Sequence, residues 1–166
     1  MQKLFAILAL VTVCGAVSLE RHEAGTHKVG RYAGSGFFSG GDKAVSAARL
    51  KDIRRGPQGA GVERVVFDID ALPGNKDAVP FFQVNINSEE NRVLVSFWAD
   101  VTYDIDRGRI ARAFSKSSRV KSVNVIPRVE AGLTTVELVL ASRLKNNVKV
   151  EAFYLSQPSR IILDLL

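Results

Sequence analysis

Tyr154-Leu155-Ser156-Gln157-Pro158-Ser159-Arg160-Ile161-Ile162-Leu163-Asp164-Leu165 is the segment that most clearly indicates the architecture of this chain. A proline turn separates two apolar segments, which predicts a strand over residues 148–155 and a terminal strand over residues 160–166. One charged residue, Asp164, interrupts the terminal apolar strand. No further domain follows in this sequence, so we expect the chain to act by binding and not by catalysis.

The same period-two alternation of apolar residues recurs upstream of this segment. It predicts strands over residues 63–69, 81–86, 92–103, 120–126 and 133–141. One helix is expected between them over residues 104–117, with Asp104 as its N-cap. Ile110, Ala113 and Phe114 recur at helical spacing and are expected to form its buried side.

Two sets of three predicted strands resemble each other. The first set covers residues 64–67, 81–84 and 91–95, the second covers residues 135–138, 150–153 and 159–163, and the third strand of each opens with an arginine, Arg92 or Arg160. One such unit cannot bury its apolar face alone, whereas two units packed face to face can. The sequence therefore predicts an all-β fold with one helix, a β-sandwich of two antiparallel, roughly three-stranded sheets.

The N-terminus has the pattern of a signal peptide over residues 1–16. Lys3 precedes an apolar segment, Leu4 to Val13, that is too short to span a bilayer and has the length of a signal-peptide core. Small residues follow, so cleavage is expected after Ala16 or after residue 18. Lipidation of Cys14 is the alternative, although the residue before a lipidated cysteine is normally smaller than Val13.

Residues 17–47 are expected to be a flexible, glycine-rich tether, and residues 48–166 the folded domain. The tether lacks a run of alternating apolar residues, and such composition buries too little surface to offset chain entropy. Its aromatic residues Tyr32, Phe37 and Phe38 are unusual for a linker. A short helix is a further possibility over residues 42–54.

Charge and composition narrow the classes of partner. The net charge of +6 suits an anionic partner but is equally consistent with ordinary solubility. The chain has no basic low-complexity arm and no RNA-binding aromatic signature, which argues against nucleic acid. Removal of Cys14 with the leader would leave a mature chain without disulfides, and we expect no transmembrane segment in it.

At this point the chain resembles the AMIN domain, a module of bacterial N-acetylmuramoyl-L-alanine amidases and type IV pilus secretins. The matching segments are Leu50-Lys51-Asp52-Ile53-Arg54, Arg64-Val65-Val66-Phe67-Asp68 and Leu155-x-x-Pro158-x-Arg160-Ile161-Ile162-Leu163-Asp164-Leu165. The resemblance implies a periplasmic β-sandwich that binds peptidoglycan and targets a partner activity. The chain departs from the family pattern in the length of residues 69–80, in the helix and in lacking a downstream domain.

We expect no enzymatic activity, no metal and no cofactor. Zinc hydrolysis requires about three protein ligands, and the two histidines, His22 and His27, both lie in the predicted tether. No histidine lies in the domain to activate a serine. A carboxylate pair is the remaining catalytic option, either Asp68 with Asp70 on one strand face or Asp104 with Asp106. A solvated strand edge for the first pair and helix capping for the second are strongly favoured instead.

The candidate ligand-binding residues form a basic helix face. Arg109, Arg112 and Lys116 fall opposite the apolar side of the predicted helix, with Arg119 just beyond it. Several cations on one face can bind carboxylates or phosphates of wall polymers. A solvated amphipathic helix face is the alternative and is favoured.

The residues Leu155, Pro158, Arg160 and Asp164 are interpreted as structural. Arg160 is expected to fix the turn or to pair with a nearby carboxylate. Asp164 is expected either to point outward or to accept backbone hydrogen bonds.

The leading hypothesis is a non-catalytic, periplasmic or secreted module that binds peptidoglycan or another anionic wall polymer and localises itself or a partner. The alternative is a protein-binding accessory of a secretin or pilus machine in the envelope, which could act through an exposed strand edge. A hydrolase with a carboxylate site is the third class.

Overall fold

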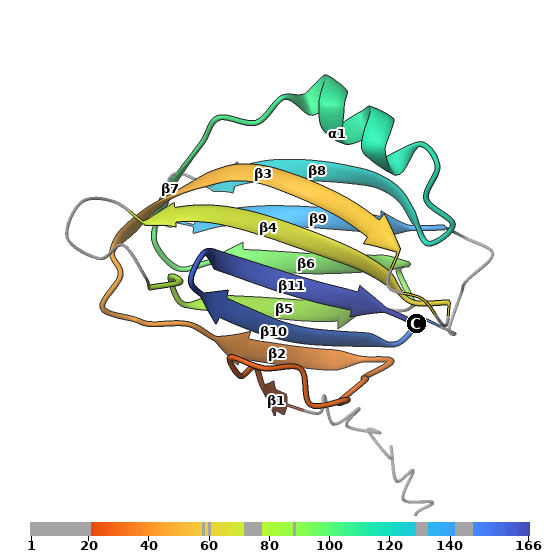
Figure 1. Cartoon of the computed structure of the whole chain (residues 1–166), viewed down its shortest axis with the longest axis horizontal. Coiled ribbons are helices and arrows are strands. Elements are labelled where there is room, and N and C mark those ends of the chain that lie inside the picture. The colour runs from red at the N-terminus through yellow and green to blue at the C-terminus, as the bar shows by residue number, and fades with distance from the viewer. Residues whose placement is uncertain are drawn as a thin grey trace, which may run out of the picture.

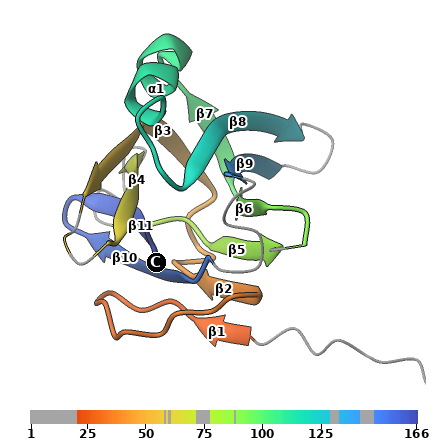
Figure 2. The ribbon, with the colours of Figure 1, turned by 90° about the vertical axis from the view of Figure 1, so that its right-hand side faces the viewer.

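The computed structural model of the chain describes residues 21–57, 59, 61–71, 78–87, 89–128, 133–141 and 148–166. The predicted signal peptide over residues 1–16, including Cys14, lies outside these residues. Within them, strands β1 to β11 form two sheets that pack face to face (Figure 1, Figure 2). The same residues contain one helix, α1. The prediction of an all-β sandwich with one helix is confirmed.

The first sheet has six strands in the order β1-β2-β5-β6-β9-β8. Their bounds are β1 Arg21–Glu23, β2 Gly36–Gly40, β5 Phe82–Asn87, β6 Arg92–Phe97, β8 Val120–Arg128 and β9 Leu133–Leu140. The second sheet has five strands in the order β10-β11-β4-β3-β7. Their bounds are β3 Ala47–Pro57, β4 Glu63–Ala71, β7 Asp100–Tyr103, β10 Val150–Ser156 and β11 Ser159–Leu165. The helix α1, Arg107–Phe114, packs against β3 and β8 at one open end of the sandwich (Figure 2).

Both sheets are larger than predicted, and both are mixed. The pairs β1/β2 and β3/β7 are parallel, whereas the other pairs are antiparallel. The additional strands have two sources. Residues 21–57 supply β1, β2 and β3, and the predicted strand over residues 92–103 is divided at Trp98 and Ala99 into β6 and β7, which belong to different sheets.

The core lies between the two sheets and follows the alternation read from the sequence. On β6, Val93, Val95 and Phe97 are buried while the residues between them are half-buried. The Phe97 ring packs edge to face on the ring of Phe67, which belongs to the other sheet, and the ring centroids are 6.4 Å apart. Such aromatic pairs contribute about 1 kcal/mol beyond the burial of their area. The contact therefore helps to hold the two sheets together.

The two halves of the chain repeat each other but exchange strands. The hairpin β5–β6 pairs with β9, and the hairpin β10–β11 pairs with β4. The registers are equivalent, because Val93 lies opposite Leu138 and Ile161 lies opposite Phe67. The expectation that each repeat forms its own sheet is therefore wrong. The first strand of each half, β4 or β9, pairs with the hairpin of the other half.

Residues 21–47, predicted to be a flexible tether, belong to the sandwich. β2 pairs antiparallel with β5, and Phe38, Ala33 and Val45 are buried. The segment 24–35 crosses the edge of β10, where Ala33 and Val150 exchange backbone hydrogen bonds of 2.8 Å in both directions. The tether prediction fails because long-range pairing, and not local alternation, supplies the hydrogen bonds and burial.

The helix is shorter than predicted. Asp106, and not Asp104, is the N-cap, and its side chain accepts a hydrogen bond from the Arg109 amide at 2.9 Å. Ile110 and Phe114 are buried, as predicted from their spacing. The possible helix over residues 42–54 is absent from the described chain, since this region enters β3, whose long pairing with β4 fixes it as a strand.

Candidate functional site

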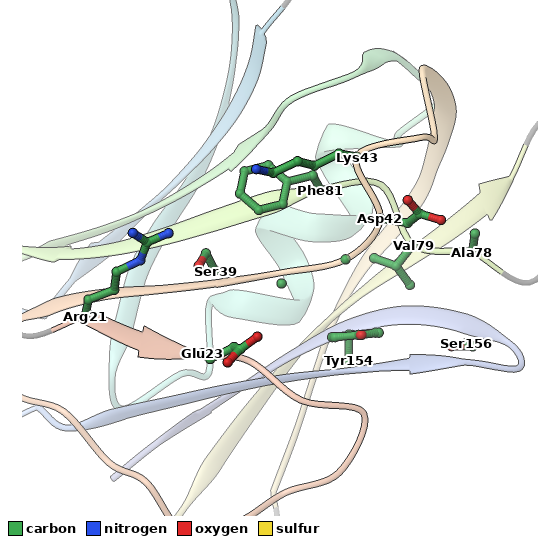
Figure 3. A pocket seen from close by; sticks show the side chains of 12 residues that line it. Arg21, Glu23, Ser39, Asp42, Lys43, Ala78, Val79, Phe81, Tyr154 and Ser156 are labelled. Atoms are coloured by element: carbon green, nitrogen blue, oxygen red, sulfur yellow. The ribbon is translucent and has the colours of Figure 1, made fainter.

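A recess of about 920 Å³ opens to solvent where β1, β2 and the end of β10 meet the segments 41–43 and 78–81 (Figure 3). We call it the groove. β2 contributes Ser39 and Gly40, and β10 contributes Tyr154 and Ser156. Most of its wall therefore comes from residues that lie inside the predicted tether.

Two glycines give the groove its shape. A Cβ atom on Gly40 would lie 2.9 Å from the Ala24 carbonyl oxygen and 3.2 Å from the Tyr154 ring. Gly41 has a left-handed φ of +84°, and a Cβ there would lie 2.3 Å from the Pro80 carbonyl oxygen. Only glycine lets these backbones approach so closely.

Backbone hydrogen bonds fix the loop that follows β2. The Asp42 amide donates to the Val79 carbonyl at 2.8 Å, and the Phe81 amide donates to the Asp42 carbonyl at 3.0 Å. These bonds hold residues 41–43 against residues 79–81, so the groove is formed before any ligand arrives.

Two half-buried aromatic rings line the groove, and in Figure 3 the strand that carries Ser39 runs between Phe81 and Tyr154. Phe81 carries the Lys43 ammonium 5.1 Å from its ring centroid. Tyr154 packs edge to face on the buried Phe82, with centroids 6.0 Å apart. Packing of this kind keeps an aromatic ring in place while leaving part of its surface in contact with solvent.

Charges of both signs surround these rings. Arg21 and Lys43 are cationic, while Glu23 and Asp42 are anionic, and all four are exposed (Figure 3). Asp42 also accepts the Ala44 amide at 2.8 Å, which orients its carboxylate. The groove therefore combines apolar faces with sites for both carboxylate and ammonium groups.

The two histidines lie in different elements. His22 on β1 stacks on Phe38 with centroids 4.9 Å apart, and His27 is exposed in the following loop. Among the described residues, no group of three or more His, Cys, Asp or Glu side chains could hold a metal ion. Asp68 and Asp70, the carboxylates considered for catalysis, pair with Arg54 and Arg160 and with Lys51, respectively.

The predicted basic residues do not act as one free surface. Arg109 forms an ion pair with Asp52 of β3 at 2.9 Å, and Arg119 donates to the Gly61 carbonyl at 2.6 Å. Arg112 is 76% exposed and lies 4.0 Å from Asp106. Lys116 is exposed just after the helix. Arg112 and Lys116 thus remain the more accessible cations of the four predicted site residues.

Among the residues that carry the resemblance to the AMIN domain, Asp164 links strands of the second sheet. Asp164 is fully buried and accepts two hydrogen bonds from Arg64, at 2.7 and 2.9 Å, and one from Lys28 at 2.7 Å. Burial alone would raise the pKa of Asp164, but the hydrogen bonds from Arg64 and Lys28 outweigh burial and lower it. Asp164 points away from the core, as the alternation of the strand predicted, but side-chain cations, and not solvent or backbone amides, meet it there.

The other motif residues surround the turn between β10 and β11. Arg160 donates to Asp68 at 3.0 Å, which confirms its predicted pairing with a nearby carboxylate. Pro158 follows a cis peptide bond, and Leu155 is half-buried.

One structural residue escaped the sequence interpretation. Glu151 is 1% exposed, and one of its oxygens accepts the amides of Val29, Gly30 and Arg31 at 2.9, 2.6 and 3.1 Å. Three successive amides that converge on one oxygen form an anion-binding nest. Here the nest is filled by the protein's own carboxylate, which anchors the segment 24–35 to β10. A glutamate within an apolar strand was the only available signal.

No protein-family model matches this chain, and no curated protein matches it. The resemblance to the AMIN domain stays a prediction based on the residues quoted for it. Among the described residues, no helix combines the length and the apolar character needed to cross a membrane.

Proposed function

We propose that this chain is a non-catalytic, exported module that binds peptidoglycan in the groove and so localises itself or a partner in the cell envelope. The observation that carries the proposal is the placement of Phe81 and Tyr154 beside cationic and anionic side chains in one preformed recess. The signal-peptide pattern of residues 1–16 supports export.

The chemistry of peptidoglycan matches this combination. Its sugar rings have apolar faces that suit the exposed surfaces of Phe81 and Tyr154. Its stem peptides carry carboxylates, which suit Arg21 and Lys43, and ammonium groups, which suit the carboxylate of Glu23. A surface of one charge sign would attract any polyanion, whereas the groove matches a ligand that carries both charges.

Arg112 and Lys116 on the basic helix face are the competing site for an anionic wall polymer. The groove is preferred because it is concave and lined by aromatic rings, as binding sites for small ligands usually are. Arg109 is already paired with Asp52, and the Arg119 guanidinium donates to the Gly61 carbonyl, so both side chains already have partners within the protein.

Co-sedimentation with purified sacculi tests the proposal. The groove variant R21E/K43E and the helix variant R112E/K116E each replace two exposed cations by two anions, so they change the net charge equally. We expect the groove variant to lose most of its sacculus binding and the helix variant to keep it. Circular dichroism and thermal melting establish that both variants are folded.

Loss of sacculus binding by the helix variant alone, with binding kept by the groove variant, assigns binding to the helix face. Equal retention by both folded variants, or no sacculus binding by the wild-type protein, contradicts the proposal. A loss that is equal in both variants indicates a response to net charge alone and contradicts the groove as the site.

A further inference from the structure

A second recess, of about 390 Å³, runs between α1 and the edge strand β8. Residues 121–125 of β8 line it consecutively. A recess on one face of a strand would be lined by alternate residues, because successive side chains point to opposite faces. Five consecutive lining residues therefore mean that this recess follows the edge of the strand, where its backbone groups lie.

β8 ends its sheet, and in the described chain it pairs with β9 alone. An edge strand presents a row of unpaired N–H and C=O groups, which can pair with another extended chain. The two ends of β8 are protected, by the irregularity between Val120 and Ser122 and by Pro127, which has no N–H. The backbone between these two points is left available.

The recess also has an apolar wall. Ile110 and Phe114 of α1 line it and are almost fully buried, and Val123 and Val125 are partly buried against the core. Ile126, at the end of the free edge, is 37% exposed. An added strand would place alternate side chains against this apolar wall while its backbone pairs with β8.

The charges of the recess identify the kind of partner. The charged residues that line it, Arg107 and Lys121, are both cationic; Arg112 lies exposed on the neighbouring helix, and Lys116 lies exposed just after it. A second copy of this chain is a poor occupant, because its own β8 would bring Lys121 toward like charges and the chain carries a net charge of +6. A strand that alternates acidic and apolar residues satisfies both the cations and the apolar wall.

We propose that the edge of β8, together with α1, binds an extended acidic segment of a partner protein by strand addition. This site is separate from the groove, so the protein can hold the cell wall and a partner protein at the same time. Its partner is recognised by backbone pairing along residues 121–126, by apolar contact with Ile110 and Phe114, and by charge contact with Arg107 and Lys121.

A library of random peptides displayed on phage, selected on the purified protein, tests this proposal. We expect enrichment of peptides in which Asp or Glu alternates with apolar residues. The enriched peptides, once synthesised, should protect from hydrogen exchange those amides of residues 121–126 that point away from β9. The variant R107E/K121E should bind them about tenfold more weakly, while R112E/K116E, which reverses two cations outside the recess, should lose less than about threefold.

Three results would overturn the proposal. These are a selection that enriches no acidic alternating peptide, protection that maps outside β8, and self-association of the wild-type protein that protects the same amides in sedimentation and exchange experiments. Sacculus binding measured with the peptide present separates the two sites, since the peptide should not displace the protein from sacculi. Melting curves establish that R107E/K121E is folded.

Discussion

Asp164 joins distant parts of the chain through one buried carboxylate. Its bidentate contact with Arg64 links β11 to β4, and its contact with Lys28 reaches a residue 136 positions away in the sequence. Lys28 lies in the segment 24–35, which Glu151 holds a second time through the amides of residues 29–31. These two carboxylates, on adjacent strands, fix the N-terminal segment on the outer face of the sheet.

Replacement of Asp164 by asparagine should destabilise the protein strongly. The substitution keeps the shape of the side chain but leaves Arg64 without its buried counter-charge, and such a loss costs about 3 kcal/mol. The matched control is Asp70→Asn on β4, whose partner Lys51 is 54% exposed and whose loss should cost below about 1 kcal/mol. Urea unfolding followed by circular dichroism measures both values, and equal values would contradict the buried role of Asp164.

The same carboxylate should make stability depend on acid pH. The pKa of Asp164 lies below its ordinary value of 3.8 in the folded protein because Arg64 and Lys28 outweigh its burial. Its stabilising contribution is therefore fully present above about pH 4 and is lost as the pH falls from there through the lowered pKa. The wild-type protein should lose stability over this range more steeply than Asp164→Asn does, as measured by urea unfolding at a series of pH values.

At the scale of the element, β2 is one of the strands that sequence alternation could not predict, as are β1 and β3. Because β2 is short and contains glycines, its sequence shows no clear alternation of apolar residues. Its position is set by pairing with β5, more than 40 residues downstream. β5, β6 and β9 were predicted because each alternates clearly, and the apolar side of α1 was predicted from Ile110 and Phe114. Local pattern therefore identified the elements that bury their own alternating side chains.

Phe38→Ala should destabilise the protein by about 3 kcal/mol, because Phe38 is 1% exposed in the core. The matched control is Phe37→Ala on the same strand, since Phe37 is half-buried and carries the Arg21 guanidinium 5.6 Å from its ring centroid. The control should cost much less. If both substitutions left the melting temperature unchanged, residues 21–47 would be a tether after all.

At the scale of the whole molecule, the exchange of strands makes the two halves interdependent. β4 of the first half completes the sheet of β10 and β11, and β9 of the second half pairs with β6. The repeat was visible in the sequence, but the exchange was not, because two stacked repeats and two exchanged repeats bury the same alternating residues. The pairing of Phe67 with Ile161, and of Val93 with Leu138, distinguishes them.

Neither half should therefore fold alone. Fragments 21–118 and 119–166, produced separately, should each lack the dispersed amide NMR spectrum of the intact chain, and an equimolar mixture should recover it. Apolar strands left without their partners expose a free edge and an open core. A fragment that folds by itself would show that the exchanged pairing is not required.

The candidate site could be predicted only in part. The basic residues of α1 were found from helical spacing, whereas Arg21, Lys43, Phe81 and Tyr154 come from separate segments that meet only through sheet pairing and the loop after β2. Long-range contact, and not local spacing, assembles the groove. The role of Glu151 was hidden for the same reason.

The groove is tested most directly by titrating soluble peptidoglycan fragments into the isotope-labelled protein and following each amide signal by NMR. The account predicts that signals of residues 39–43, Phe81 and Tyr154 shift in proportion to bound fragment, while those of α1 and β8 stay in place. Shifts confined to α1, or no saturable shift anywhere in the chain, would contradict it.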